Sequence, residues 1–225
     1  MRMFSGLAAA LLLACLAGAA EAQTLTATAA GWMKLDNGEY SRNGIAPSAN
    51  IITGADTGSS LAWRSFVSFA VPASESPYGE VELQLGVSGV LSGPNTLEIF
   101  DVTTNVATDP VETVYADLGT GVSYGSAAGL NSNQTAMVVL NAQGLAAVNA
   151  ARGGTVTFGL VNATISPGGE DTIFSSSGGS TPRALVLTAP EPTSVPTLSE
   201  WAMILFGAML ASAAALVIQR RRLVA

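Results

Sequence analysis

The feature that most constrains this chain is a run of eighteen residues without a charge, Trp201 to Ile218, close to the C-terminus. Three arginines end the run: Arg220, Arg221 and Arg222. A helix of this length crosses about 30 Å of hydrocarbon, and a helix in a protein core does not usually end in three like charges. The run therefore predicts a transmembrane helix over 201–219. We expect residues 220–225 to form a basic cytoplasmic tail that stops translocation of the chain across the membrane. The part of the chain before the helix then lies outside the cytoplasm.

A second apolar stretch, Met3 to Gly18, lies at the N-terminus and ends in Ala20-Glu21-Ala22. It is too short to cross a bilayer, and the alanines at Ala20 and Ala22 form an A-x-A cleavage pattern. Residues 1–22 therefore predict a secretory signal peptide. The alternative is that Leu12-Leu13-Ala14-Cys15, which loosely resembles a lipobox, makes Cys15 a lipidated N-terminus.

The composition excludes several function classes. The chain has no histidine and one cysteine, so a Ser-His-Asp or Cys-His nucleophile system, a zinc finger and a haem site are excluded. From Gln23 to Ser199, five Lys and Arg residues stand against fourteen Asp and Glu residues, a net charge near −9. This charge disfavours nucleic acid as a partner and leaves a structural Ca²⁺ as the conceivable cofactor.

Apolar residues in the middle of the chain recur at every second position. In Glu80 to Val87 the alternation puts four of them on one face: Val81, Leu83, Leu85 and Val87. The same alternation recurs at Val67, Phe69 and Val71, at Leu97 and Ile99, at Val156, Phe158 and Leu160, and at Leu185 and Leu187. Many short strands separated by turn residues predict an all-β fold, a single antiparallel β-sandwich over residues 23–190.

One segment of this domain has helical rather than strand spacing. Asn141 can cap a short helix in which Leu145 and Val148 share a face, and Gly153-Gly154 ends it. We expect one short helix, packed on an edge of the sandwich.

A short motif, Val195-Pro196-Thr197-Leu198-Ser199-Glu200-Trp201, lies in the linker 191–200 that precedes the apolar run. The motif, the helix and the arginine cluster together resemble the IPTL-CTERM sorting signal, a relative of the PEP-CTERM signals of Gram-negative bacteria. Val195 stands where the family usually has Ile, and Ala202 where it often has Gly. The other motif residues are in place: Pro196, Thr197, Leu198 and Trp201. The resemblance implies that an exosortase-type membrane transpeptidase cleaves the tail and passes the domain to the cell surface or extracellular matrix. A plain juxtamembrane linker is the alternative.

The domain itself resembles, less specifically, the DNRLRE-type jelly-roll modules of secreted bacterial proteins. The resemblance rests on the strands Arg64 to Val71, Glu80 to Val87 and Ser180 to Thr188, and on a turn at Asp117-Leu118-Gly119. It implies a jelly-roll-like sandwich and assigns no activity.

Paired carboxylates are the first candidate site, because glycoside cleavage uses two carboxyl groups across a groove. The pairs are Asp101 with Asp109 or Asp117, and Glu170 with Asp171. Glu170 and Asp171 follow Pro167-Gly168-Gly169, so we expect them in a solvated turn. With so few supporting groups, we expect no enzyme.

The sequence also offers residues for two kinds of binding site. Asp36, Asn37 and Glu39 offer oxygen ligands for Ca²⁺, although an ordinary hairpin turn at Asn37-Gly38 explains them as well. A glycan platform could be formed by aromatic residues: Trp32 and Trp63, with Tyr40, Tyr78, Tyr115 and Tyr124.

The sequence therefore favours an exported, C-terminally sorted surface or matrix protein whose mature domain is structural or adhesive. The alternatives are a carbohydrate-binding module or glycan-active enzyme on the same fold, and a protein that stays anchored in the membrane by its helix or by a lipid.

Overall fold

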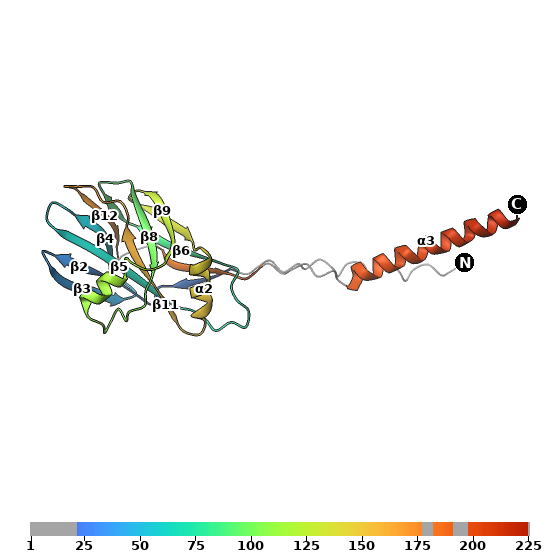
Figure 1. The fold of residues 1–225 in the computed structure, drawn as a ribbon, viewed down its shortest axis with the longest axis horizontal. Coiled ribbons are helices and arrows are strands. Elements are labelled where there is room, and N and C mark those ends of the chain that lie inside the picture. Colours follow the sequence, from blue (N-terminus) through green and yellow to red (C-terminus); the bar gives the residue numbers. More distant parts are fainter. Residues whose placement is uncertain (1–21, 177–181, 191–197, 225) are drawn as a thin grey trace, which may run out of the picture. The chain divides into compact units, whose positions relative to one another are not determined.

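The computed structural model describes residues 22–176, 182–190 and 198–224. Thirteen strands and three helices form in these ranges, and the chain divides into two units. One unit is Ala20–Pro190, an antiparallel β-sandwich (Figure 1); the other comprises Met1–Ala19 and Glu191–Ala225. The expected mostly-β fold is confirmed, whereas the jelly-roll resemblance stays a prediction.

The smaller sheet has four strands. Their order is β1 (Ala22–Thr26), β13 (Arg183–Thr188), β6 (Glu80–Val87) and β10 (Gln134–Val139). The alternation that predicted β6 is confirmed, because Val81, Leu83, Leu85 and Val87 are each at most 1% exposed. The odd-numbered residues of β6 therefore form the inner face of this sheet.

The larger sheet has nine strands. Its main order is β7 (Gly89–Leu91), β12 (Glu170–Ser175), β4 (Ile51–Asp56), β5 (Leu61–Ala70), β11 (Thr155–Asn162), β8 (Asn95–Asp101) and β9 (Ser123–Leu130). In addition, β2 (Ala29–Asp36) pairs with β5 and with β3 (Glu39–Ala46).

The chain passes directly from one sheet to the other at two places. Only Ala27 and Thr28 separate β1 from β2, and only Ser88 separates β6 from β7. Backbone hydrogen bonds hold both crossings: Thr28 N donates to Ser68 O and Ser88 N to Phe174 O, both at 2.8 Å. These crossings tie the two sheets around one core.

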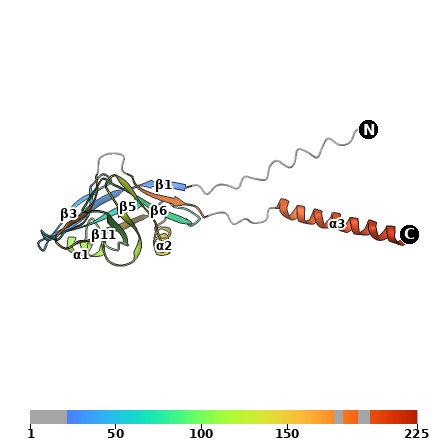
Figure 2. The ribbon, with the colours of Figure 1, turned by 90° about the horizontal axis from the view of Figure 1, so that it is seen from above.

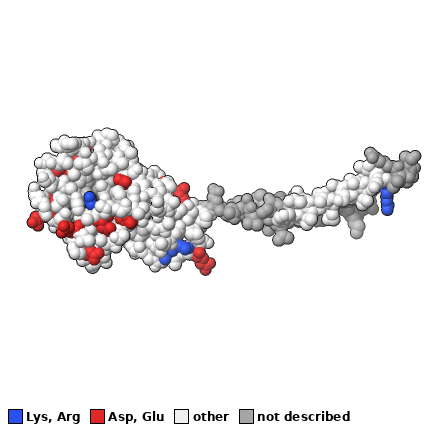
Figure 3. Space-filling view, viewed as in Figure 1, with Lys and Arg blue, Asp and Glu red and all other residues white. Residues whose placement is uncertain are grey.

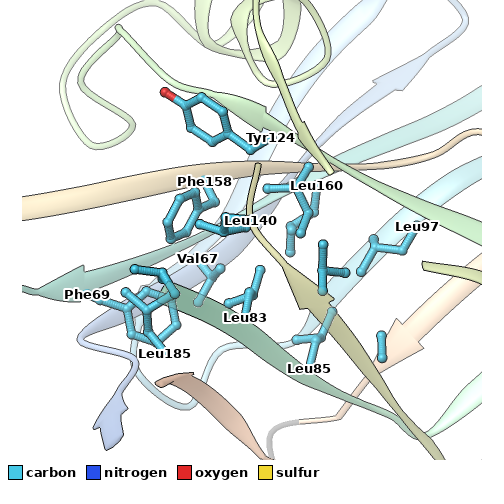
Figure 4. Packing of buried hydrophobic residues seen from close by; sticks show 14 of the residues in the cluster. Val67, Phe69, Leu83, Leu85, Leu97, Tyr124, Leu140, Phe158, Leu160 and Leu185 are labelled. Carbon is cyan, nitrogen blue, oxygen red and sulfur yellow. The ribbon is translucent and has the colours of Figure 1, made fainter. Parts of the chain in front are cut away.

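That core is built from the residues that the alternation predicted. Phe158 is fully buried in this core, and its ring centroid lies 6.1 Å from those of both Phe69 and Tyr124 (Figure 4). The other predicted inward residues are buried as well: Val67, Val71, Leu97, Ile99, Val156, Leu160, Leu185 and Leu187.

The predicted short helix is α2 (Ala142–Ala150). Asn141 caps it, because its Oδ1 accepts hydrogen bonds from Gln143 N at 3.1 Å and Gly144 N at 3.0 Å. Val148 is buried in the main core and Leu145 packs against it. The cap and the apolar face of this helix are confirmed.

A second short helix, α1 (Val111–Asp117), was not predicted. It covers the face of the large sheet opposite the core and forms its own hydrophobic cluster with Met33 and Phe66. Seen from above, α1 lies beside this sheet (Figure 2). The chain after α1 approaches β11 so closely that a Cβ on Gly159 would lie 2.3 Å from Leu118 O. Two turns of helix are too short to show a period in the sequence, and the contacts that hold them come from distant strands.

Candidate functional site

The C-terminal helix α3 spans Leu198–Val224, and its segment Trp201–Arg220 is long and apolar enough to cross a membrane, with a mean hydropathy of 2.2. At a rise of about 1.5 Å per residue, twenty residues match the hydrocarbon thickness of a bilayer.

The helix is apolar on every side. Four consecutive residues point in successive directions around the axis, and all are large and exposed: Met203, Ile204, Leu205 and Phe206, at 57–71%. An amphipathic helix that docks on a protein would bury one face and keep the other polar. Exposed apolar side chains on every face instead suit lipid.

The two ends of this segment carry the residues expected at membrane interfaces. Trp201 is 56% exposed in the first turns of the helix, and Arg220 is exposed at the other end of the apolar segment. The helix continues to Val224, so Arg221 and Arg222, predicted as part of a tail, are helical. Cations in the last turns of a helix also interact favourably with its dipole.

The structure describes only the second part of the sorting motif, at the start of this helix. Leu198 is its first residue and Trp201 lies in its first turn, whereas Val195, Pro196 and Thr197 lie outside the described residues.

The predicted signal-peptide end meets the sandwich at the edge of the small sheet. Ala22 is the first residue of β1 and pairs with Thr188, the last residue of β13. Ala20 and Cys15 lie outside the described residues. The strands that begin and end the sandwich are therefore neighbours. A groove of ≈520 Å³ lies beside them, lined in part by Gln23, Tyr78 and Pro190.

Three of the catalytic candidates hold the backbone of one long connection, residues 102–122. Asp101 Oδ1 accepts from Val122 N at 2.7 Å, and Asp109 Oδ2 accepts from Asn105 N at 2.8 Å. Asp117 accepts four hydrogen bonds from Thr103 and Thr104 at 2.8–3.0 Å. These carboxylates fix the loop that carries α1.

The expectation of a turn at Glu170 and Asp171 was wrong, and the expected solvation holds for Glu170 but not for Asp171. Both residues belong to β12, and Asp171 is completely buried. Pairing with Ala55 of β4 places Asp171 inside the sandwich, where its Oδ2 accepts a hydrogen bond from Ser166 N at 2.5 Å. Glu170, opposite Asp56, remains exposed. The two side chains are therefore in different environments.

Replacing Asp117 with asparagine should lower the free energy of unfolding at pH 7 by about 1–2 kcal/mol, because the Thr103 and Thr104 donors lose a charged acceptor. Burial raises the pKa of Asp117, but the hydrogen bonds, led by those from Thr104, outweigh it and leave the pKa below its ordinary value. The stabilisation is therefore complete above the ordinary Asp pKa of about 3.9 and is lost as the pH falls through the lowered value.

Urea unfolding of the full chain in mild detergent, at pH 7 and at pH 3, measures both effects. The exposed Glu75→Gln variant is the matched control and should stay within about 0.5 kcal/mol of the wild type. A difference between Asp117→Asn and the wild type that does not shrink in acid would contradict this account.

The calcium candidates form a hairpin turn between β2 and β3. Asn37 and Gly38 have φ values of 47° and 91°, as a type I′ turn requires. Asp36 Oδ2 accepts from Lys34 Nζ at 2.9 Å, and Asp36 Oδ1 from Asn37 Nδ2 at 3.0 Å. The bond from Lys34 is the largest cause that holds the pKa of Asp36 below its ordinary value. In the part of the chain that the structure describes, no three His, Cys, Asp or Glu side chains gather around a point that could hold a metal.

The tyrosines proposed for a glycan platform pack into the two hydrophobic clusters instead. Tyr40 of β3 and Tyr115 of α1 meet edge-on, with ring centroids 5.4 Å apart. Tyr124 is in the main core and Tyr78 packs against it. Burial raises the pKa of both Tyr115 and Tyr124. Trp32 and Trp63 lie elsewhere, partly exposed on β2 and β5.

The sequence did not predict the hydrogen-bond partners of the arginine side chains in the sandwich. Each of its four arginines donates to backbone carbonyls. Arg42 donates to the carbonyls of Val106, Ala107 and Asp109, and Arg64 donates to those of Tyr115 and Ala116. Arg152 donates to the carbonyls of Ser74 and Asn149. Arg183 donates to those of Pro47, Ala49, Ser175 and Ser176. Lys34 forms the single salt bridge found among the described residues.

Most carboxylates of the sandwich therefore have no cationic partner, and its surface is acidic. Asp and Glu residues gather over the part of the sandwich where Figure 1 labels α1, β2 and β3 (Figure 3). Such a surface repels nucleic acid and anionic lipid.

Comparison with known proteins assigns one segment of the chain. Residues 193–222 match the IPTL-CTERM motif, which confirms the resemblance of the tail. The match contains Leu198 to Arg222, where the helix lies. No curated protein matches the chain in sequence.

Proposed function

We propose that this chain is the precursor of an exported protein of a Gram-negative bacterium, which an exosortase-type transpeptidase cleaves in the region of Val195 to Leu198. The observation that carries the proposal is the coincidence of the motif match over 193–222 with a helix that is apolar on every side and ends in arginines. A helix of this kind holds the precursor in the membrane, and cleavage beside it frees the sandwich.

The mature sandwich is a structural or adhesive module of the cell surface or extracellular matrix, and it is not an enzyme. Supporting this, Asp101, Asp109 and Asp117 hold backbone N–H groups rather than facing one another across a groove. Its acidic surface keeps it soluble outside the cell.

Intact-mass measurement of the protein released from its native host tests processing. The released protein should begin at Gln23 and lack Arg220, Arg221 and Arg222, since the signal peptide and the C-terminal helix have been removed. Pro196→Ala should reduce the released form at least tenfold and leave the full-length protein in the membrane. Pro192→Ala, which changes a proline just outside the V-P-T-L motif, is the matched control and should be released normally.

Two results of the mass measurement would contradict the proposal. A surface protein that retains Arg220 to Arg222 is permanently anchored, and one that begins with a lipidated Cys15 is a lipoprotein. Equal release of the Pro196→Ala and Pro192→Ala variants would show that the motif is not recognised.

A further inference from the structure

Trp32 of β2 and Trp63 of β5 lie on the same face of the large sheet. In the ladder between these strands Trp32 is opposite Ser65 and Lys34 is opposite Trp63, without a register shift. The two indoles are therefore diagonal neighbours, which in such ladders are about 7–8 Å apart between backbone positions. Met33, between Trp32 and Lys34, points to the other face, where α1 covers it.

Neither indole fills a core. The main core and the cluster under α1 account for the large buried side chains of the sandwich, and neither includes Trp32 or Trp63, not even among the partly buried residues packed against them. Both side chains are partly exposed. Two of the largest apolar side chains thus lie on one face of the sheet, at diagonal positions, where neither cluster includes them.

Uncharged polar side chains of β3 lie beside the two rings. The neighbouring strand β3 places Asn43 opposite Trp32 and Ser41 opposite Lys34, and both are exposed. The ammonium of Lys34 is neutralised by Asp36 at 2.9 Å. The face therefore combines flat apolar rings with an amide and a hydroxyl group that both donate and accept hydrogen bonds.

We propose that this face, Trp32 and Trp63 flanked by Ser41 and Asn43, binds a neutral polysaccharide. Sugar rings present apolar C–H faces that stack on aromatic rings, while their hydroxyl groups need nearby donors and acceptors. An acidic polysaccharide is disfavoured because the carboxylates of the sandwich outnumber its cations and repel it. The inference rests on the proposed function in one respect, that export brings the sandwich to a matrix containing such polymers.

Affinity electrophoresis of the full chain, in mild detergent, tests the proposal. Native gels contain hydroxyethyl cellulose, galactomannan or dextran as neutral polymers, and alginate as an acidic one. We expect at least one neutral polymer to slow the wild-type protein. Trp32→Ala and Trp63→Ala should each raise the dissociation constant for that polymer about tenfold. Trp63→Phe, which keeps an aromatic ring, should retain most of the binding.

Met137→Ala is the matched control, because Met137 is 58% exposed on the small sheet and should not affect binding. Urea unfolding of each variant separates lost binding from lost folding. The proposal is overturned if no neutral polymer slows the protein, if the tryptophan variants are slowed as much as the wild type, or if only alginate slows it. A dimer that depends on Trp32 and Trp63 would overturn it in favour of a second copy of the chain. The gels require neither export nor cleavage, so their result is independent of the mass measurement that tests processing.

Discussion

Phe158→Ala is expected to lower the free energy of unfolding of the sandwich by about 3–5 kcal/mol. Phe158 is fully buried in the middle of β11 and packs against Phe69 and Tyr124, whose ring centroids both lie 6.1 Å from its own. Truncation removes apolar contacts and leaves a cavity that two sheets of fixed spacing cannot close. Domains of this size are stable by about 5–15 kcal/mol, so the loss is a large share of the total.

Urea unfolding of the full chain in mild detergent, followed by tryptophan fluorescence, measures this loss. Met137→Ala again serves as the control: it also shortens an apolar side chain, but an exposed one, and should stay within about 0.5 kcal/mol of the wild type. If the two variants unfold at the same urea concentration, the packing of Phe158 does not stabilise the sandwich as described.

Leu210→Asp should release the precursor from the membrane. Leu210 lies at the middle of the segment Trp201–Arg220, where an aspartate in place of a leucine costs about 3–4 kcal/mol of insertion free energy. Adding Phe206→Asp raises the cost further, and the double variant should pass through the membrane into the exterior instead of stopping in it.

A Gram-negative laboratory host without a sorting enzyme allows this measurement, because the tail then stays uncleaved. The double variant should move from the membrane fraction to the soluble exterior fraction, whereas Leu210→Ala with Phe206→Leu should remain in the membrane. A double aspartate variant that stays in the membrane fraction would show that α3 is not what holds the precursor there.

Period-two alternation predicted the inward faces of the strands, because a strand with one buried face repeats its environment every second residue. The residues of β6 and the pair Phe158 and Leu160 illustrate this, since all are buried as expected. The cap at Asn141 was also predictable, since it depends on residues within three positions.

Other features depend on contacts between residues far apart in the sequence. Arg42 donates to the carbonyl of Val106, 64 positions away, and Arg64 donates to that of Tyr115, 51 positions away. Asp171 follows a turn-forming sequence, but pairing with Ala55 draws it into the interior. Local composition does not encode such partners.

The sequence by itself predicted a C-terminal helix apolar enough to cross a membrane, and it predicted the inward-facing side chains of β5, β6, β8, β11 and β13. Those outcomes follow from local hydrophobicity and its period, through the free energy of transfer from water. Only the tertiary structure decided that the arginines hold loops, that α1 covers the second face of the large sheet, and that Trp32 and Trp63 share one face while the tyrosines are in the cores. The physical reason is that strand register across the sheet, not spacing along the chain, sets which distant side chains meet.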